Sequence, residues 1–245
     1  MIKEIILAVI QGVTEFLPVS SSGHLALVSN LFGEANLFFF VALHVASLLA
    51  VLIYFRKDIW KLRKISEKKI RHYWSYILIG IIPAGAFGFF FGDLIEQAIS
   101  SYLFIGIAFL ITGSLLLATK FIRGKKGLTF WKSFWVGMAQ ILALFPGISR
   151  SGTTTAVAMF QRVDPEKAGR FSFIIFIPLA IGAMIFEFGS FYFDISLLIS
   201  FIVCFFVSLG ALNLFFRSLK KNYFWIFGIY CFILGILSLI FATLF

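Results

Sequence analysis

The stretch "QGVTEFLPVSSSGHL", residues 11–25, is a polar interruption near the start of a very apolar chain. It contains a glutamate, three consecutive serines, a histidine, a proline and two glycines. The 245-residue chain is otherwise 61% hydrophobic, with 34 Phe and a mean hydropathy of +1.02. Only 13% of it is charged, and the apolar residues form long blocks without alternation. We therefore expect an integral membrane protein whose function depends on this interruption.

The long apolar blocks predict six transmembrane helices. A helix needs roughly 20 mostly apolar residues to cross about 30 Å of hydrocarbon. Segments of about ten alternating residues, which would indicate a membrane β-barrel, are not found. The predicted spans are Leu37–Phe55, Trp74–Phe91, Tyr102–Thr119, Phe171–Phe188, Ile195–Phe216 and Tyr223–Leu244.

The basic residues between these blocks predict the orientation of the chain. Connections rich in Lys and Arg lie in the cytoplasm, whereas residues 92–101 and 189–194 contain neither and are expected outside. The net charge of +10 then follows from topology, and no nucleic-acid partner is expected. The cytoplasmic connections are Arg56–His72, Lys120–Lys132 and Arg217–Lys221.

Neither the cysteines nor the N-terminus indicates secretion or zinc binding. Cys204 and Cys231 lie inside apolar blocks, where packing is favoured over a disulfide framework or metal ligation. Met1–Ile10 lacks a small-residue cleavage pattern, so we expect it to be retained.

Two weakly apolar segments, residues 1–33 and 132–165, remain outside the six spans, and they resemble each other. The stretch "QILALFPGISRSGTT" from Gln140 matches the first stretch without a gap at five positions. Three spans follow each segment, so the second half would run inverted relative to the first. The matched residues are Gln11, Phe16, Ser20, Ser22 and Gly23 with Gln140, Phe145, Ser149, Ser151 and Gly152.

These features predict an all-α polytopic membrane protein with six transmembrane helices and two re-entrant helical hairpins in an inverted-topology repeat. Residues 1–245 form a single membrane domain, in which the repeats 1–119 and 132–245 are joined by a basic cytoplasmic loop. Irregular backbone at membrane depth must be buried in protein or line a wet cavity. We therefore expect the first hairpin to enter from outside, the second from the cytoplasm, and their tips to meet.

The residues at the predicted tips suit a phosphate. Arg150 within a bilayer costs roughly 2.5–3.5 kcal/mol on insertion scales, and its planar fork can bind phosphate bidentately. The glycines of "SSSGH" and "SRSGT" allow sharp turns that aim the N–H groups of a following helix into the cavity. The predicted substrate-binding residues are Ser20, Ser22, Gly23, Ser149, Ser151, Gly152, Thr153 and Thr154.

Glu15 is the one residue here that a passive anion site does not require. It could hold a divalent cation or act as a general base. Any single serine could instead bond only to its own helix backbone, and His24 alone would more often be a hydrogen-bonded interior residue than a catalyst. For His44 we favour the interior interpretation, with a supporting role near the site as the alternative. Gln11 shares the helix face of Glu15.

The two motifs "QGVTEFLPVSSSGHL" and "PGISRSGTT" resemble the signature regions of the undecaprenyl-pyrophosphate phosphatase family, also called the bacitracin-resistance family. The segment "HVASLLAVLIYFRKDIW" is similar to the one that follows the first motif there, and the order matches over essentially the whole chain. The resemblance implies dephosphorylation of a polyprenyl pyrophosphate to its monophosphate, which recycles the lipid carrier of envelope glycan assembly. It also implies the inverted-repeat fold.

The resemblance further implies a divalent cation, Mg²⁺ or Ca²⁺, and a plasma-membrane site open to the outside, in contact with membrane lipids; a homodimer is left open. Catalytic roles fall on Glu15, Ser21, His24 and Arg150. Some members have glutamate where this chain has Gln11, so the metal is expected on Glu15 with Gln11 nearby.

The sequence leaves several mechanisms open. Ser21 could attack phosphorus, activated by Glu15 or His24, to give a phosphoserine. Alternatively, metal-held water attacks directly and Ser21 only orients the phosphate. A transporter or flippase for a polyprenyl phosphate is the rival from another class, because inverted repeats are shared with carriers. A purely structural membrane protein would leave Arg150 unexplained.

Overall fold

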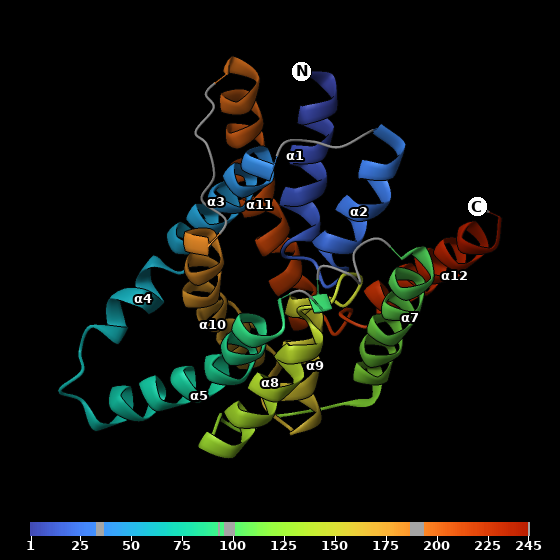
Figure 1. Ribbon diagram of the computed structural model, residues 1–245. Helices are drawn as coiled ribbons and strands as arrows, with labels where there is room; N and C mark the ends of the chain where they lie inside the picture. Colours follow the sequence, from blue (N-terminus) through green and yellow to red (C-terminus); the bar gives the residue numbers. More distant parts are fainter. Residues whose placement is uncertain (33–36, 93, 96–100, 187–193, 245) are drawn as a thin grey trace.

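The computed structural model describes residues 1–32, 37–92, 94–95, 101–186 and 194–244 (Figure 1). Eleven α-helices and a short 3₁₀ helix account for most of this part of the chain. The elements are α1 (Ile2–Thr14), α2 (Ser21–Phe32), α3 (Leu37–Tyr54), α4 (Arg56–Leu62), α5 (Lys68–Phe90), α7 (Tyr102–Ala118), η1 (Thr119–Phe121), α8 (Phe130–Leu142), α9 (Arg150–Phe160), α10 (Pro165–Phe186), α11 (Ile195–Lys220) and α12 (Ile226–Leu244).

Long apolar helices dominate the described residues. Five of them are long and apolar enough to cross a membrane: α5, α7 with η1, α10, α11 and α12. The bent pair of α3 and α4, which turns by 72°, brings the number to six if it counts as one span. Each predicted span therefore corresponds to a helix, and the protein is an all-α integral membrane protein.

The helix boundaries differ from the prediction where Lys and Arg residues adjoin the apolar blocks, which we call the basic end of the molecule. The connection predicted at Arg56–His72 contains all of α4 and the start of α5, and α10 begins at Pro165 rather than Phe171. Hydropathy detects where apolar residues begin, but a helix continues through Lys and Arg because both are good helix formers. Most of the predicted connections 92–101 and 189–194, and the end of the predicted span at Phe188, lie outside the described residues.

The two segments left over in the sequence each form a pair of short helices around an irregular turn. The first pair is α1 and α2, of 13 and 12 residues, and the second is α8 and α9, of 13 and 11 residues. At 1.5 Å per residue each helix is about 16–20 Å long, which is shorter than the hydrocarbon layer. The helices break at the positions that Pro, Gly and Ser predict, within residues 15–20 and 143–149.

Both pairs restart their second helix with the same capping contact. The Ser20 hydroxyl accepts a hydrogen bond from the Gly23 amide (3.3 Å), and the Ser149 hydroxyl accepts one from the Gly152 amide (3.2 Å). A serine oxygen that accepts from the first turn in this way is a helix N-cap. Ser20 and Ser149, which match in the two stretches, therefore both cap the second helix of their pair.

The two turns are in contact, as the sequence predicts. The Gly147 amide donates to the Ser20 hydroxyl (3.1 Å), and the Ser151 hydroxyl donates to the Leu17 carbonyl (3.3 Å). A Cβ on Gly23 would lie only 2.9 Å from the Gly147 Cα. Gly147 and Ser20 both have positive φ, of 90° and 67°, so the approach requires unusual backbone on each side.

Each helix pair packs on a long helix from the other half of the chain. In Figure 1, α1 lies beside α11, and α8 lies beside α5. A Cβ on Gly12 would lie 2.8 Å from the Cys204 carbonyl oxygen, and one on Gly137 would lie 2.8 Å from the Gly80 carbonyl oxygen. Glycine thus permits the backbones to approach closely at both interfaces, as is common between membrane helices.

The helices α7 and α12 meet along two glycine pairs. A Cβ on Gly235 would lie 3.0 Å from the Gly106 carbonyl oxygen, and one on Gly113 would lie 3.0 Å from the Gly228 carbonyl oxygen. Because the residue numbers rise on one helix as they fall on the other, the two helices run antiparallel (Figure 1). This seam joins the last helix of each half.

Candidate active site

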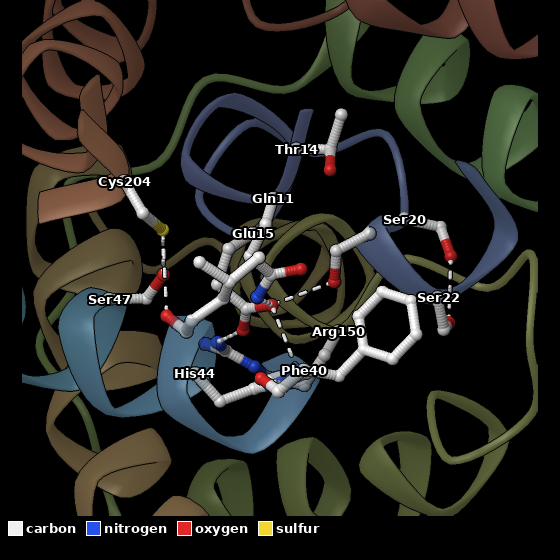
Figure 2. Close-up of polar contacts among 12 residues, drawn as sticks. Gln11, Thr14, Glu15, Ser20, Ser22, Phe40, His44, Ser47, Arg150 and Cys204 are labelled. Atoms are coloured by element: carbon white, nitrogen blue, oxygen red, sulfur yellow. Dashed lines mark hydrogen bonds and ion pairs between the residues drawn. The ribbon is translucent and has the colours of Figure 1, made fainter. Parts of the chain in front are cut away.

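Glu15 lies at the C-terminal end of α1, where the two turns meet, and its side chain is only 8% exposed. Its Oε2 accepts hydrogen bonds from the Ser21 hydroxyl (2.7 Å) and from Gln11 Nε2 (3.0 Å). Its Oε1 accepts from Arg150 Nη2 at 3.2 Å. Figure 2 shows the Gln11, Glu15 and Arg150 side chains converging. Donors from both turns therefore hold a single buried carboxylate.

Ser21 is the first residue of α2, and its half-buried side chain faces the carboxylate. At 2.7 Å, with Glu15 accepting, the hydroxyl proton points to Oε2 and the oxygen lone pairs point away from it. An alcohol held in this way against a carboxylate has the geometry of a nucleophile and its general base. Because Ser21 is the first residue of α2, its hydroxyl lies at the helix end where backbone N–H groups have no partner within the helix.

Arg150 is the first residue of α9. Its side chain reaches from the turn between α8 and α9 to Glu15, beside the turn between α1 and α2. Its Cζ lies 3.9 Å from the centre of the Phe176 ring and 5.7 Å from that of Phe173, so aromatic faces orient the guanidinium. Its Nη1 is buried and has no partner among the described residues. A buried N–H without a partner is costly, which indicates that an anion belongs beside this atom.

His44, in the middle of α3, is a site residue that sequence reasoning placed in the interior. Its Nδ1 lies 2.9 Å from the Phe40 carbonyl, which can only accept, so Nδ1 carries a proton. Its Nε2 then faces Glu15 Oε2 at 3.9 Å (Figure 2). Protonation of Nε2 would make this contact attractive. The sequence does carry one signal for a role of His44 at the site, because an ionisable residue inside an apolar span is costly and often marks a functional position.

His24 is held in a different set of contacts. Its Nδ1 donates to the Ser20 carbonyl (2.7 Å), and its Nε2 lies 2.7 Å from the Tyr230 hydroxyl. The ring is parallel to Tyr230 and meets Phe109 edge-on. Both ring nitrogens are therefore occupied in fastening the first turn to α12, and Glu15 is the base nearest to Ser21. A catalytic role for His24 stays a prediction.

The predicted substrate-binding hydroxyls fall into two groups. Ser20 and Ser149 cap helices, Ser151 bonds the first turn, and Thr154 donates to the Arg150 carbonyl at 2.7 Å. Ser22 is exposed, and Thr153 is buried with no hydroxyl partner within the part of the chain that the structure describes. The amides of Gly23 and Gly152 donate to the caps. Substrate contact by any of these eight residues stays a prediction.

The oxygen atoms around Glu15 could take part in metal binding only with help from a ligand. The described residues contain no group of three or more His, Cys, Asp and Glu side chains suited to a metal ion. However, Gln11 Oε1 is buried next to the Glu15 carboxylate and has no hydrogen-bond partner among the residues that the structure describes. One carboxylate, one amide oxygen and substrate phosphate oxygens form a ligand set that Mg²⁺ accepts.

Comparisons with known proteins agree with this arrangement. The family model "Bacitracin resistance protein BacA" matches residues 4–237. The undecaprenyl-diphosphatase of Methanococcus maripaludis (strain C7) is 37% identical over 247 residues, covering 98% of this chain and 99% of that protein. The undecaprenyl-diphosphatases of Desulfosudis oleivorans (96% of each chain) and Thermosipho africanus (96% and 98%) are also 37% identical. The family inferred from the two motifs is confirmed, and the chain belongs to the bacitracin resistance protein BacA family.

Proposed function

We propose that the protein hydrolyses the terminal phosphate of a long-chain polyprenyl pyrophosphate of the undecaprenyl type and releases the polyprenyl monophosphate. Family membership and the names of the relatives support this activity. The observation that carries it is the contact of one carboxylate with an alcohol and a guanidinium, Ser21–Glu15–Arg150. A carrier that only binds an anion would gain little from a carboxylate bonded to a serine. The product would be the lipid carrier that envelope glycan synthesis uses again.

In the first step Arg150 holds the terminal phosphate through Nη1, and the positive N-terminal ends of α2 and α9 favour its charge. The Ser21 oxygen forms a bond to the terminal phosphorus while its proton moves to Glu15 Oε2. The bond from phosphorus to the bridging oxygen breaks. Glu15 passes its proton to that oxygen, and the polyprenyl monophosphate leaves.

In the second step water attacks the phosphoserine and gives a proton to Glu15. Glu15 returns this proton to the Ser21 oxygen as inorganic phosphate leaves, so the enzyme regains its starting state. In the variant without a covalent intermediate, Ser21 orients the phosphate and Glu15 takes the proton from the attacking water directly. The 2.7 Å contact between Ser21 and Glu15 supports the covalent route.

A divalent cation, Mg²⁺ or Ca²⁺, would be held by Glu15 and the unpartnered Gln11 Oε1 together with pyrophosphate oxygens. When bound, it would neutralise part of the charge on the pyrophosphate. With a single carboxylate in this set, we expect weak metal binding by the protein without substrate.

We also propose that the helix pairs are re-entrant, that the halves form an inverted repeat, and that the site opens to the outside of the plasma membrane. Equivalent contacts at equivalent positions support the repeat. Thr112 of α7 donates to the Gly147 carbonyl (3.0 Å), and Cys231 of α12 lies 3.7 Å from the Pro18 carbonyl, so the last helix of each half supports the turn of the other. The basic connections support the orientation.

Phosphate release by purified protein from synthetic polyprenyl pyrophosphates, with and without chelator, tests the activity. We expect release that stops with chelator and falls at least about a hundredfold in Arg150→Lys, because a point charge replaces a bidentate fork. The matched control is Arg63→Lys, whose exposed side chain lies over Trp60. No release from any polyprenyl pyrophosphate, or full activity in Arg150→Lys, would contradict the proposal.

A further inference from the structure

A cavity of about 890 Å³ lies at the basic end of the molecule, between α4, the start of α5, residues 127–128 and the start of α10. It shares no lining residue with the Glu15 site. Six of its lining residues are Lys, Arg or His: Lys61, Lys68, Lys69, His72, Lys167 and Arg170. The only acidic residue that lines it is Asp58.

The charge in this cavity is not neutralised within the protein. Arg170 is paired with Asp58 at 2.7 Å. The lysines 61, 68, 69 and 167 are exposed, and none makes an ion pair with an acidic residue in the described parts of the chain. Like charges gathered around one cavity repel each other. An anion in the cavity would relieve that repulsion.

Three of the four lysines lie at helix N-termini. Lys68 and Lys69 lie in the first turn of α5, and Lys167 lies in the first turn of α10. The N-terminus of a helix carries partial positive charge, so it favours anions and disfavours lysine. At α10 the Lys167 amide already donates to the Asp164 carboxylate (3.1 Å), so the uncompensated charge around the cavity is that of the four lysine ammonium groups.

Apolar side chains form part of the cavity wall, which distinguishes the cavity from a site for a small soluble anion. Leu62, Ile70, Leu128 and Ile174 line it together with Tyr73 and Tyr76. The wall formed by α4 is fixed in place, because Trp74 Nε1 donates to the Leu62 carbonyl (3.0 Å) and Asp58 pairs with Arg170 of α10. Cationic groups beside apolar walls match a molecule with an anionic head and an apolar tail.

The position of the cavity indicates which molecule that is. The membrane-spanning helices α5 and α10 begin here, so the cavity lies near one end of two spans, where headgroups meet hydrocarbon. Basic pockets between transmembrane helices at this level bind anionic lipid headgroups. We propose that the cavity binds one anionic glycerophospholipid, with its phosphate among the four lysines and the start of its chains against Leu128 and Ile174.

Native mass spectrometry of the purified full-length protein in neutral detergent tests this site. The probes are dioctanoyl phosphatidylglycerol, dioctanoyl phosphatidylcholine and inorganic phosphate. We expect one phosphatidylglycerol to bind at least about tenfold more tightly than phosphatidylcholine. Replacing all four lysines by Gln (K61Q, K68Q, K69Q, K167Q) should remove that preference, whereas phosphate release from polyprenyl pyrophosphate should be unchanged.

The matched control removes the same charge outside the cavity, with K64Q, K120Q, K125Q and K221Q, and should keep the preference. A neutral variant, Leu128→Trp, fills the space and should weaken phosphatidylglycerol binding without a change in charge. Equal binding of the two lipids, equal losses in the two quadruple variants, unaltered binding in Leu128→Trp, or displacement of the lipid by millimolar phosphate would each overturn the proposal.

Discussion

The two oxygens of Glu15 face different partners. Oε2 accepts from Ser21 and Gln11, whereas Oε1 accepts from Arg150. Among the described residues Arg150 Nη1 has no partner, so in the proposed reaction Arg150 can bind phosphate through Nη1 while Nη2 donates to Glu15.

Replacing Ser21 by Ala should lower kcat by about a thousandfold or more, because the proposed nucleophile is lost while Arg150 remains to bind phosphate. Phosphate release and acid-quenched single turnovers with labelled substrate measure this loss and the phosphoserine. The control is Ser114→Ala, whose exposed hydroxyl bonds only to the Leu110 carbonyl of its own helix. Wild-type turnover in Ser21→Ala would show that water attacks directly.

Replacing His44 by Gln should lower kcat by about tenfold. The amide keeps the size of the side chain but cannot offer a positive charge at 3.9 Å from Glu15 Oε2. His72→Gln is the control, because this exposed histidine of α5 bonds to the Lys68 carbonyl of its own helix. Full activity in His44→Gln would contradict a role for the contact with Glu15.

The two histidines show what a single sequence can and cannot predict about the site. Motif position singled out His24, but its ring nitrogens are bonded to Ser20 and Tyr230. His44 lies 29 positions after Glu15, and only the packing of α3 near the turn brings the two together. By contrast, the contact of Glu15 with Ser21 and Arg150 was predictable, because the matching turns carry those residues.

At the scale of elements, the irregular turns depend on close approach. A Cβ on Gly23 would lie 2.7 Å from Phe109 Cζ and 2.9 Å from the Gly147 Cα. The ring can move, but the backbone of the second turn cannot move without shifting Arg150, three residues later. The relative position of the two turns therefore sets the distance between base and guanidinium.

Gly23→Ala should destabilise the protein by about 1–3 kcal/mol through overpacking and lower kcat/KM by at least about tenfold. Thermal unfolding in detergent and phosphate release measure the two effects. Gly210→Ala is the matched control, since that helical glycine has nothing within 4 Å of its added Cβ and alanine favours helix. Equal stability and activity of Gly23→Ala and the wild type would contradict the contact between the turns.

The breaks within the helix pairs were predictable, whereas the starts of α5 and α10 were not. Pro18, Gly147 and the serine caps interrupt a helix for local reasons that a sequence displays. The helix starts at Lys68 and Pro165 lie beyond the apolar blocks, where Lys and Arg continue the helix and Trp74 and Arg170 bond to Leu62 and Asp58 of α4. Hydropathy does not report such contacts.

At the scale of the whole molecule, the proposed orientation can be tested with single added cysteines. Asp194→Cys, at the start of α11, should react with an impermeant maleimide on intact cells. Lys125→Cys, in an exposed part of a basic connection, should react only after permeabilisation. The unaltered protein is the control, because Cys204 and Cys231 are both 0% exposed. The reverse labelling pattern would contradict the orientation.

The packing of α1 on α11 also dictates an order of events during synthesis. The ribosome delivers α1 at the beginning, but the helix that covers its Gly12 face starts at residue 195. At typical elongation rates of about 5–20 residues per second, that delay lasts roughly ten to forty seconds. In a nascent chain α2 and α3 can contact α1 early, but the Gly12 face of this short helix stays uncovered until α11 is made. A chain truncated before α11 should keep the Gly12 face of α1 uncovered, and we expect the cell's membrane quality control to degrade it.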